Sequence, residues 1–275
     1  MKKNTHHPIF IFAFCLAVLS TTINSANAHD PIFAIGPHTL FKGGVETALS
    51  INRSEKSTTQ ETLFDWNVSY GITGDWVAGI EIPYAIKKSN SVTENGFDDV
   101  KLFTKYRFWR NDSLGVQETA AALLKLDLDS ANENVSNGAI DTIMGLTYGY
   151  ESRKWYRWAA ARYRMNGKND AGINRGNKWL GDLVVGIRPW PVVDYYKPDT
   201  VVMLELNAEY TEKSETNGLS LTNTGGTELF ISPGIFWTLR NFAIKSGVQI
   251  PIYDDLNGAQ TASDYRANLT FEFHF

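Results

Sequence analysis

The chain is poor in several features that define common classes of protein. Its single cysteine, Cys15, allows no intrachain disulfide and no cysteine-based metal or redox centre. No segment after the first residues has a run of about 18 apolar residues, which excludes membrane-spanning helices there. The formal net charge of −4 disfavours a nucleic-acid partner, because such a partner needs a basic surface. No glycine-rich phosphate loop occurs, so we expect no cofactor.

Residues 1–28 are typical of a cleaved secretory signal peptide. Lys2 and Lys3 supply the positive start, an apolar run follows, and residues 26–28 (Ala-Asn-Ala) form a small-x-small cleavage site. The apolar run is too short to span a bilayer. Cys15 lies inside this run, so we interpret it as part of the signal, and we expect the mature chain to contain no cysteine.

Aromatic residues are abundant, and many recur at every second position. Between residue 264 and Phe275 every odd position is apolar and most even positions are polar or charged. Such alternation predicts a β-strand with one apolar face, and a strand of this length suits a tilted membrane crossing. The same pattern marks 63–72, 76–84, 99–108 and 202–210. Weaker candidates lie at 40–51, 115–128, 139–151, 154–165, 179–190, 228–238 and 241–251.

The connections between these segments alternate between short turns and long polar loops. The long ones are expected at 52–60, 87–97, 129–138, 166–177, 212–226 and 252–263. Long loops at one end and short turns at the other are the arrangement of outer-membrane barrels. We therefore predict an all-β protein: a transmembrane antiparallel up-and-down β-barrel over 40–275, of about twelve strands. An even number of strands with short turns near both termini predicts an outer-membrane location with periplasmic termini.

Residues 29–39 precede the first predicted strand and are expected to form a periplasmic N-terminal segment. Pro31, Gly36 and Pro37 disfavour a helix there. The residues leave open whether this segment enters the barrel as a small plug or lies in the periplasm.

Charged residues on the polar faces of the strands are expected to line the lumen. By position they are Asp65, Glu81, Asp99, Lys101, Lys105, Arg107, Lys125, Asp127, Glu205, Glu209, Glu228, Lys245, Arg266 and Glu272. Both signs occur, and a buried charge needs a partner. Two interpretations stay open: structural ion pairs that fill the interior, or a constriction that selects solutes by charge.

Histidine is scarce after the predicted cleavage site. Only His29, His38 and His274 remain, and the predicted topology places all three at the periplasmic end. No histidine is left for a serine- or aspartate-histidine mechanism near the outer rim, so an enzyme is not expected. Because the last strand must pair with the first, we hypothesise a copper, zinc or nickel site formed by these three histidines. Solvated or hydrogen-bonded histidines near the N-terminus are the alternative.

One stretch resembles a known family. Its motifs are Trp66-Asn67-Val68-Ser69-Tyr70-Gly71-Ile72-Thr73-Gly74-Asp75-Trp76, Gly79-Ile80-Glu81-Ile82-Pro83-Tyr84 and Gly96-Phe97-Asp98-Asp99-Val100-Lys101. They resemble the outer-membrane family linked to the MetA pathway of phenol degradation, which implies a transporter-type barrel. The terminal aromatic pattern of Phe271, Phe273 and Phe275 also resembles the signal by which barrel-assembly machinery recognises its clients.

The expected function is an outer-membrane channel or transporter for small solutes, with aromatic or hydrophobic compounds implied by the resemblance alone. The expected partners are outer-membrane lipid, the barrel-assembly machinery and a small-molecule solute. The alternative is a non-conducting structural barrel or one that binds metal at its periplasmic end.

Overall fold

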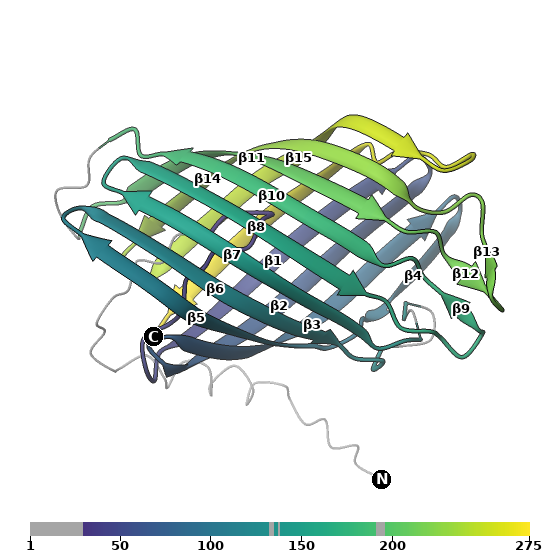
Figure 1. Cartoon of the computed structure of the whole chain (residues 1–275), viewed down its shortest axis with the longest axis horizontal. Coiled ribbons are helices and arrows are strands. Elements are labelled where there is room, and N and C mark those ends of the chain that lie inside the picture. Colours follow the sequence, from purple (N-terminus) through teal and green to yellow (C-terminus); the bar gives the residue numbers. More distant parts are fainter. Residues whose placement is uncertain (1–29, 132–134, 137, 191–195) are drawn as a thin grey trace, which may run out of the picture.

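The computed structural model describes residues 30–131, 135–136, 138–190 and 196–275. The predicted signal peptide, 1–28, and His29 lie outside the described residues. The described strands form a closed antiparallel barrel (Figure 1). Within these described ranges, no helix is long and apolar enough to cross a membrane.

Twelve strands form the barrel wall, and each pairs with its neighbours in sequence order. They are β1 (Val45–Lys56), β2 (Thr59–Thr73), β3 (Trp76–Ser89), β5 (Lys101–Ser113), β6 (Val116–Asp127), β7 (Asp141–Ser152), β8 (Trp155–Met165), β10 (Lys178–Ile187), β11 (Asp199–Thr211), β14 (Gly226–Leu239), β15 (Phe242–Leu256) and β16 (Tyr265–His274). The barrel closes where β1 pairs with β16, with Glu46 opposite His274. The predicted fold and strand number are confirmed.

The alternation of the sequence becomes two different faces of the wall. Along β2, Phe64, Trp66 and Tyr70 are exposed, whereas Ser69 and Gly71 are buried. Exposed apolar side chains recur on every wall strand, so the outer surface of the barrel is apolar. In a bilayer such a surface meets lipid, and the paired backbone of a closed sheet leaves no edge unsatisfied.

Several predicted loops contain strand. β1 and β2 continue to a tight turn at Ser57, where φ is 54°, so most of the predicted loop 52–60 is a hairpin. β4 (Val92–Phe97) likewise pairs with the far end of β3. A three-stranded sheet of β9 (Ile173–Asn174), β12 (Glu215–Thr216) and β13 (Leu219–Ser220) joins two further loops. These additions all lie at one end of the molecule, here called the long-loop end, and the opposite end, which carries Phe275, is called the short-turn end.

The segment before β1 lies inside the barrel. It appears in purple behind the front strands in Figure 1. Its backbone contacts Glu205 in the middle of β11, Lys105 on β5 and Thr147 on β7. These contacts place the segment in the lumen, which is one of the two positions that the sequence left open, the other being the periplasm. We call residues 30–40 the plug.

Candidate functional site

Glu205 holds the middle of the plug. Its carboxylate accepts hydrogen bonds from three successive backbone N–H groups: Ile32 at 2.7 Å, Phe33 at 3.2 Å and Ala34 at 2.9 Å. The side chain is only 1% exposed. Hydrogen bonds to an ionised group are about twice as strong as neutral ones, and here they satisfy polar groups of a non-regular backbone. Glu205 is thus the central attachment point of the plug.

Other wall strands fix the rest of the plug. The Thr147 hydroxyl donates to the Ile35 carbonyl at 2.7 Å, and the Lys105 ammonium donates to the Gly36 carbonyl at 3.0 Å. Lys105 also forms an ion pair with Asp30 at 3.5 Å. The plug is consequently tied to β5, β7 and β11, which lie on different sides of the lumen.

His38 anchors the short-turn end of the plug to β7. Its ring forms an ion pair with Glu151, which also accepts from the Trp158 indole N–H at 3.0 Å. Burial by itself would lower the pKa of His38, but the negative charge and hydrogen bond of Glu151 outweigh burial, and the pKa is raised above its ordinary 6.5. The imidazolium form therefore favours the docked plug.

An apolar cluster fills the lumen beside the plug. Tyr156 and Trp158 stack with ring centroids 5.3 Å apart. Ile32 and Ala34 of the plug pack against this cluster. Its other members come from four wall strands: Val184, Val201, Met203, Phe236 and Ala243. Burial of these side chains stabilises the plug in addition to its polar contacts.

On the other side of the plug the lumen contains a cavity of about 400 Å³. Its wall is polar where β1 and β16 contribute Ser50, Asn52 and Thr270. It is apolar where Phe33 of the plug and Phe103 of β5 approach it. The cavity thus offers an aromatic surface next to hydrogen-bonding groups.

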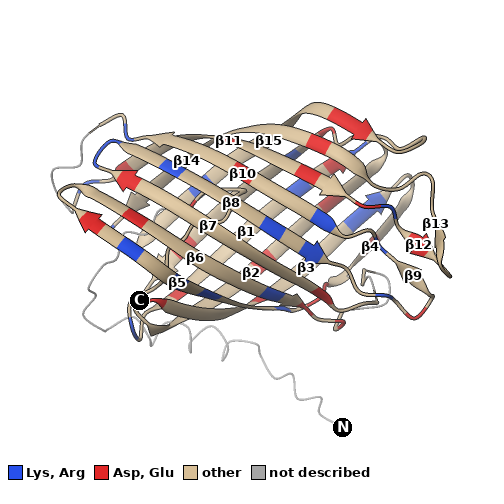
Figure 2. Cartoon of the chain, in the orientation of Figure 1, with Lys and Arg blue, Asp and Glu red and all other residues tan. Residues whose placement is uncertain are grey.

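Most charges predicted for the lumen occur as close ion pairs. Lys125 contacts Glu81 at 2.6 Å, Arg266 contacts Glu209 at 2.5 Å, and Lys245 pairs with Glu272. Arg107 pairs with Asp75 at 2.7 Å near a short turn. These pairs favour the structural interpretation over a charge-selective constriction for the residues involved. Figure 2 shows both signs spread over the barrel.

Four of the predicted lumen residues have no ion-pair partner within the described ranges: Asp99 and Glu205, which accept from backbone N–H groups, and Asp65 and Lys101. Asp65 accepts from Asn52 at 2.6 Å, and its other carboxylate oxygen is buried without a hydrogen-bond partner in the described part of the chain. Lys101 lies in register between Glu81 and Asp127 on the neighbouring strands. Neither Asp65 nor Lys101 lines the cavity beside the plug, where the charged side chains include the paired Glu81, Lys125 and Lys245.

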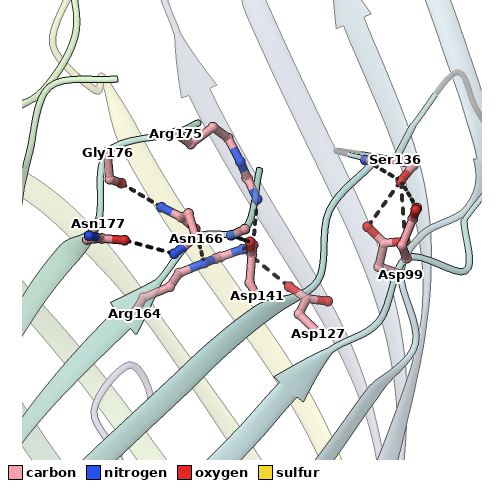
Figure 3. A network of polar contacts seen from close by, with 12 residues as sticks. Asp99, Asp127, Ser136, Asp141, Arg164, Asn166, Arg175, Gly176 and Asn177 are labelled. Carbon is pink, nitrogen blue, oxygen red and sulfur yellow. Dashed lines mark hydrogen bonds and ion pairs between the residues drawn. The ribbon is translucent and has the colours of Figure 1, made fainter. Parts of the chain in front are cut away.

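A second polar network closes around the long-loop end (Figure 3). Buried Asp141 accepts from Arg164 and Arg175, each at 2.5 Å, and from the Gly167 N–H at 2.9 Å. Nearby, Asp99 accepts from the backbone of residues 130 and 131, each at 2.9 Å. The network fixes the loops after β6 and β8 at the barrel rim.

The described residues do not form the predicted three-histidine metal site. His38 contacts Glu151 on β7, whereas His274 contacts Glu46 on β1 at 3.3 Å. β7 lies across the barrel from the β1–β16 seam, so the inward direction of both rings does not bring them together. His29 lies outside the described residues, and among those described no group of three or more His, Cys, Asp or Glu is arranged for a metal.

The sequence pointed to some residues of this site and missed others. Glu205 was predicted to face the lumen, but its backbone partners follow no side-chain pattern. Glu151 and Arg162 were missed. Arg162 pairs with Asp182 at 2.6 Å, but its strand also carries the exposed Arg157, which obscured the inward face. Allowing one strand to carry an outward charge near one end and an inward charge near the other would have identified Arg162 as a lumen residue.

Comparison with solved structures supports a channel fold. A crystal structure of an outer-membrane channel from Pseudomonas putida F1 matches with a TM-score of 0.74 at 11% identity, covering 90% of this chain and 100% of that one. The NanC porin matches with a TM-score of 0.52 at 12% identity, covering 82% and 98%.

Comparison of the sequence itself identifies the family. No curated protein matches the sequence. The model of the family described as "Putative MetA-pathway of phenol degradation" matches residues 28–250, which is most of the chain. The family resemblance seen at residues 66–101 therefore extends over most of the barrel, and the protein is a member of this family with the fold of an outer-membrane channel.

Proposed function

We propose that this outer-membrane channel carries small amphipathic aromatic solutes through its lumen, past the plug. The short-turn end, with both termini, faces the periplasm in this proposal, and the long loops face outward. The barrel-assembly machinery would recognise the terminal Phe271, Phe273 and Phe275. The cavity beside the plug is the observation that carries the proposal.

The size and lining of the cavity favour a solute with one aromatic ring. An apolar cavity of about 150 Å³ is large enough for benzene, and this one measures about 400 Å³. Phe33 and Phe103 can pack against a ring, while Ser50 and Thr270 can hydrogen-bond a hydroxyl or carboxylate. Phenols and benzoates have this combination of groups, which sugars lack.

Passage requires the plug to shift, because it crosses the lumen. Its contacts are a few hydrogen bonds and ion pairs from separate strands. An irregular segment held in this way can change position while the barrel wall stays paired. The apolar cluster at Trp158 would then separate from Ile32 and Ala34, which opens the short-turn half of the lumen.

Solute flux through variants of β1 tests the proposal. Ala48 is buried and lines the cavity, whereas its neighbour Leu49 is 52% exposed on the outer face. Uptake of benzoate and phenol would be measured in liposomes containing wild-type protein, Ala48→Trp or Leu49→Trp. We expect Ala48→Trp to reduce uptake at least tenfold and Leu49→Trp to leave it unchanged.

Equal uptake by both tryptophan variants would show that the cavity is not the route. The competing function is a non-conducting structural barrel, which the paired lumen charges favour. Folded wild-type protein that gives no uptake of any one-ring solute above empty liposomes would support that function.

A further inference from the structure

The outer face of the barrel has a continuous apolar groove over β7, β8, β10 and β11. Two adjoining hollows, of about 590 and 570 Å³, share Tyr148, Ala159, Leu183 and Leu206 in their walls. Leu183 is 61% exposed. These hollows lie on the opposite face of the wall from the lumen cavity, because the four residues that they share occupy exposed or half-buried positions, whereas the residues next to them along each strand are buried.

Small residues make the floor of this groove. Gly181 on β10 lies directly between Ala161 on β8 and Ala208 on β11 in the pairing register. Ala159 lies two residues before Ala161 and has the same facing. A Cβ added at Gly181 would meet no atom within 4 Å, so packing does not require glycine there. Glycine inside a strand weakens it and often marks a place where another molecule approaches the backbone. The small residues leave space on an otherwise bulky exterior.

A positively charged side chain, Arg157, lies at one end of the groove. Arg157 is exposed between buried Tyr156 and Trp158, and it lines the second hollow. Its guanidinium lies 5.5 Å from the centre of the Tyr150 ring, which holds it near the wall. Among the described residues it has no carboxylate partner within ion-pair distance. An unpaired arginine beside lipid is costly unless an anion meets it.

We propose that this groove is a binding site for one phospholipid, with its phosphate on Arg157 and an acyl chain over Ala159, Ala161 and Gly181. Strand geometry separates Arg157 from Ala161 by about 13 Å along the strand, which at a barrel tilt of about 40° is about 10 Å of depth and lies within the ~15 Å hydrocarbon of one leaflet. The guanidinium fork matches two phosphate oxygens. Lys154 and Trp155, which lie at the adjacent turn, add a second cation and an interfacial ring.

A phospholipid fits this groove better than a second copy of the chain. A partner barrel would place its own exposed aromatic residues against a narrow floor of alanine and glycine. The outward Glu118 of such a barrel is already the acceptor of its own Tyr148 hydroxyl. The acyl chain is thin enough for the floor, and the phosphate supplies the missing charge.

Native mass spectrometry of the mature protein in mild detergent, with dioleoylphosphatidylglycerol added, tests the site. We expect one lipid to stay bound at gas-phase energies that remove the others. Arg157→Gln should reduce its retention at least fivefold, and Gly181→Leu should do so by filling the groove. Lys42→Gln and Ala267→Leu are the matched controls on other parts of the exterior, and they should retain the lipid as wild type does.

Retention that is equal in wild type, Arg157→Gln and Gly181→Leu would overturn the proposal. A dimer that dissociates in Gly181→Leu would do the same, since it would assign the groove to a second copy. Because flux through the lumen is measured separately, loss of the lipid site leaves the proposed channel function untouched.

Discussion

Replacement of Glu205 should release the plug. In Glu205→Ala the N–H groups of residues 32–34 lose the carboxylate that they share. A hydrogen bond to a charged group contributes about 1.5–3 kcal/mol. Loss of only two of the three at the lower value is about 3 kcal/mol, which changes the ratio of docked to released plug by more than about 100-fold. Glu205→Gln should weaken docking less than Glu205→Ala, because its amide oxygen can still accept from two of the N–H groups while its NH₂ opposes the third.

A thiol placed in the plug reports its release. We expect the mature chain to contain no cysteine, so Ala34→Cys introduces a unique thiol at a buried position. A water-soluble maleimide should label this thiol slowly in the otherwise wild-type barrel. In the Glu205→Ala background, labelling should be faster by a factor of about 10 to 100 or more, limited by the intrinsic rate of the exposed thiol.

Glu209→Gln is the control for general loosening. Glu209 lies on the same strand, but its partner is Arg266 and it does not contact the plug. It should leave the labelling rate within about twofold of wild type. Equal labelling of the introduced thiol with and without Glu205, in barrels that remain heat-modifiable on gels, would refute the reasoning that this carboxylate holds the plug.

Three further predictions concern the plug, the wall and the rim. His38 faces Glu151, Asp30 and Lys105, and its pKa is raised. The contribution of His38 to docking is therefore complete below pH 6.5 and is lost as the pH rises through the raised pKa. Labelling of Ala34→Cys, corrected for the pH dependence of a free thiol, should accelerate at alkaline pH when His38 is present. It should not accelerate in the His38→Gln background. Gly71→Ala would place a Cβ 2.0 Å from the Phe41 carbonyl oxygen, whereas Gly181→Ala meets open space. Gly71→Ala should lower the free energy of unfolding by about 1–3 kcal/mol in urea titrations, whereas Gly181→Ala should not change it measurably. Equal effects of the two substitutions would contradict the packing argument. Asp141→Asn leaves Arg164 and Arg175 without their shared charge, so proteolysis of the loop at 166–177 should become several-fold faster, with Asp170→Asn as the unchanged control.

Side-chain alternation predicted the barrel well because lipid and lumen impose opposite demands on successive residues. The C-terminal strand was found with nearly its observed bounds, and its neighbour across the closing seam is β1, as expected. Alternation fails where both faces of a strand meet water. The hairpin around Ser57 and the strand β4 lie there, and their polar residues looked like loops.

The candidate site was harder to predict because it depends on contacts across the lumen. Parity indicates that Glu205 and His38 point inward, but not what each one meets. The partners of Glu205 are backbone groups that any sequence would offer. His38 and His274 were expected to meet because both lie near the short-turn end, yet carboxylates on opposite walls hold them apart.

The central claim is that the lumen is a solute path that the plug restricts. Unitary conductance in planar bilayers tests it most directly, measured for the mature protein and for Glu205→Ala under the same salt. We expect small or rare openings for wild type and a several-fold larger or more frequent conductance for Glu205→Ala. The absence of measurable conductance from both proteins, each shown to be folded and inserted, would contradict the claim that the lumen is a solute path.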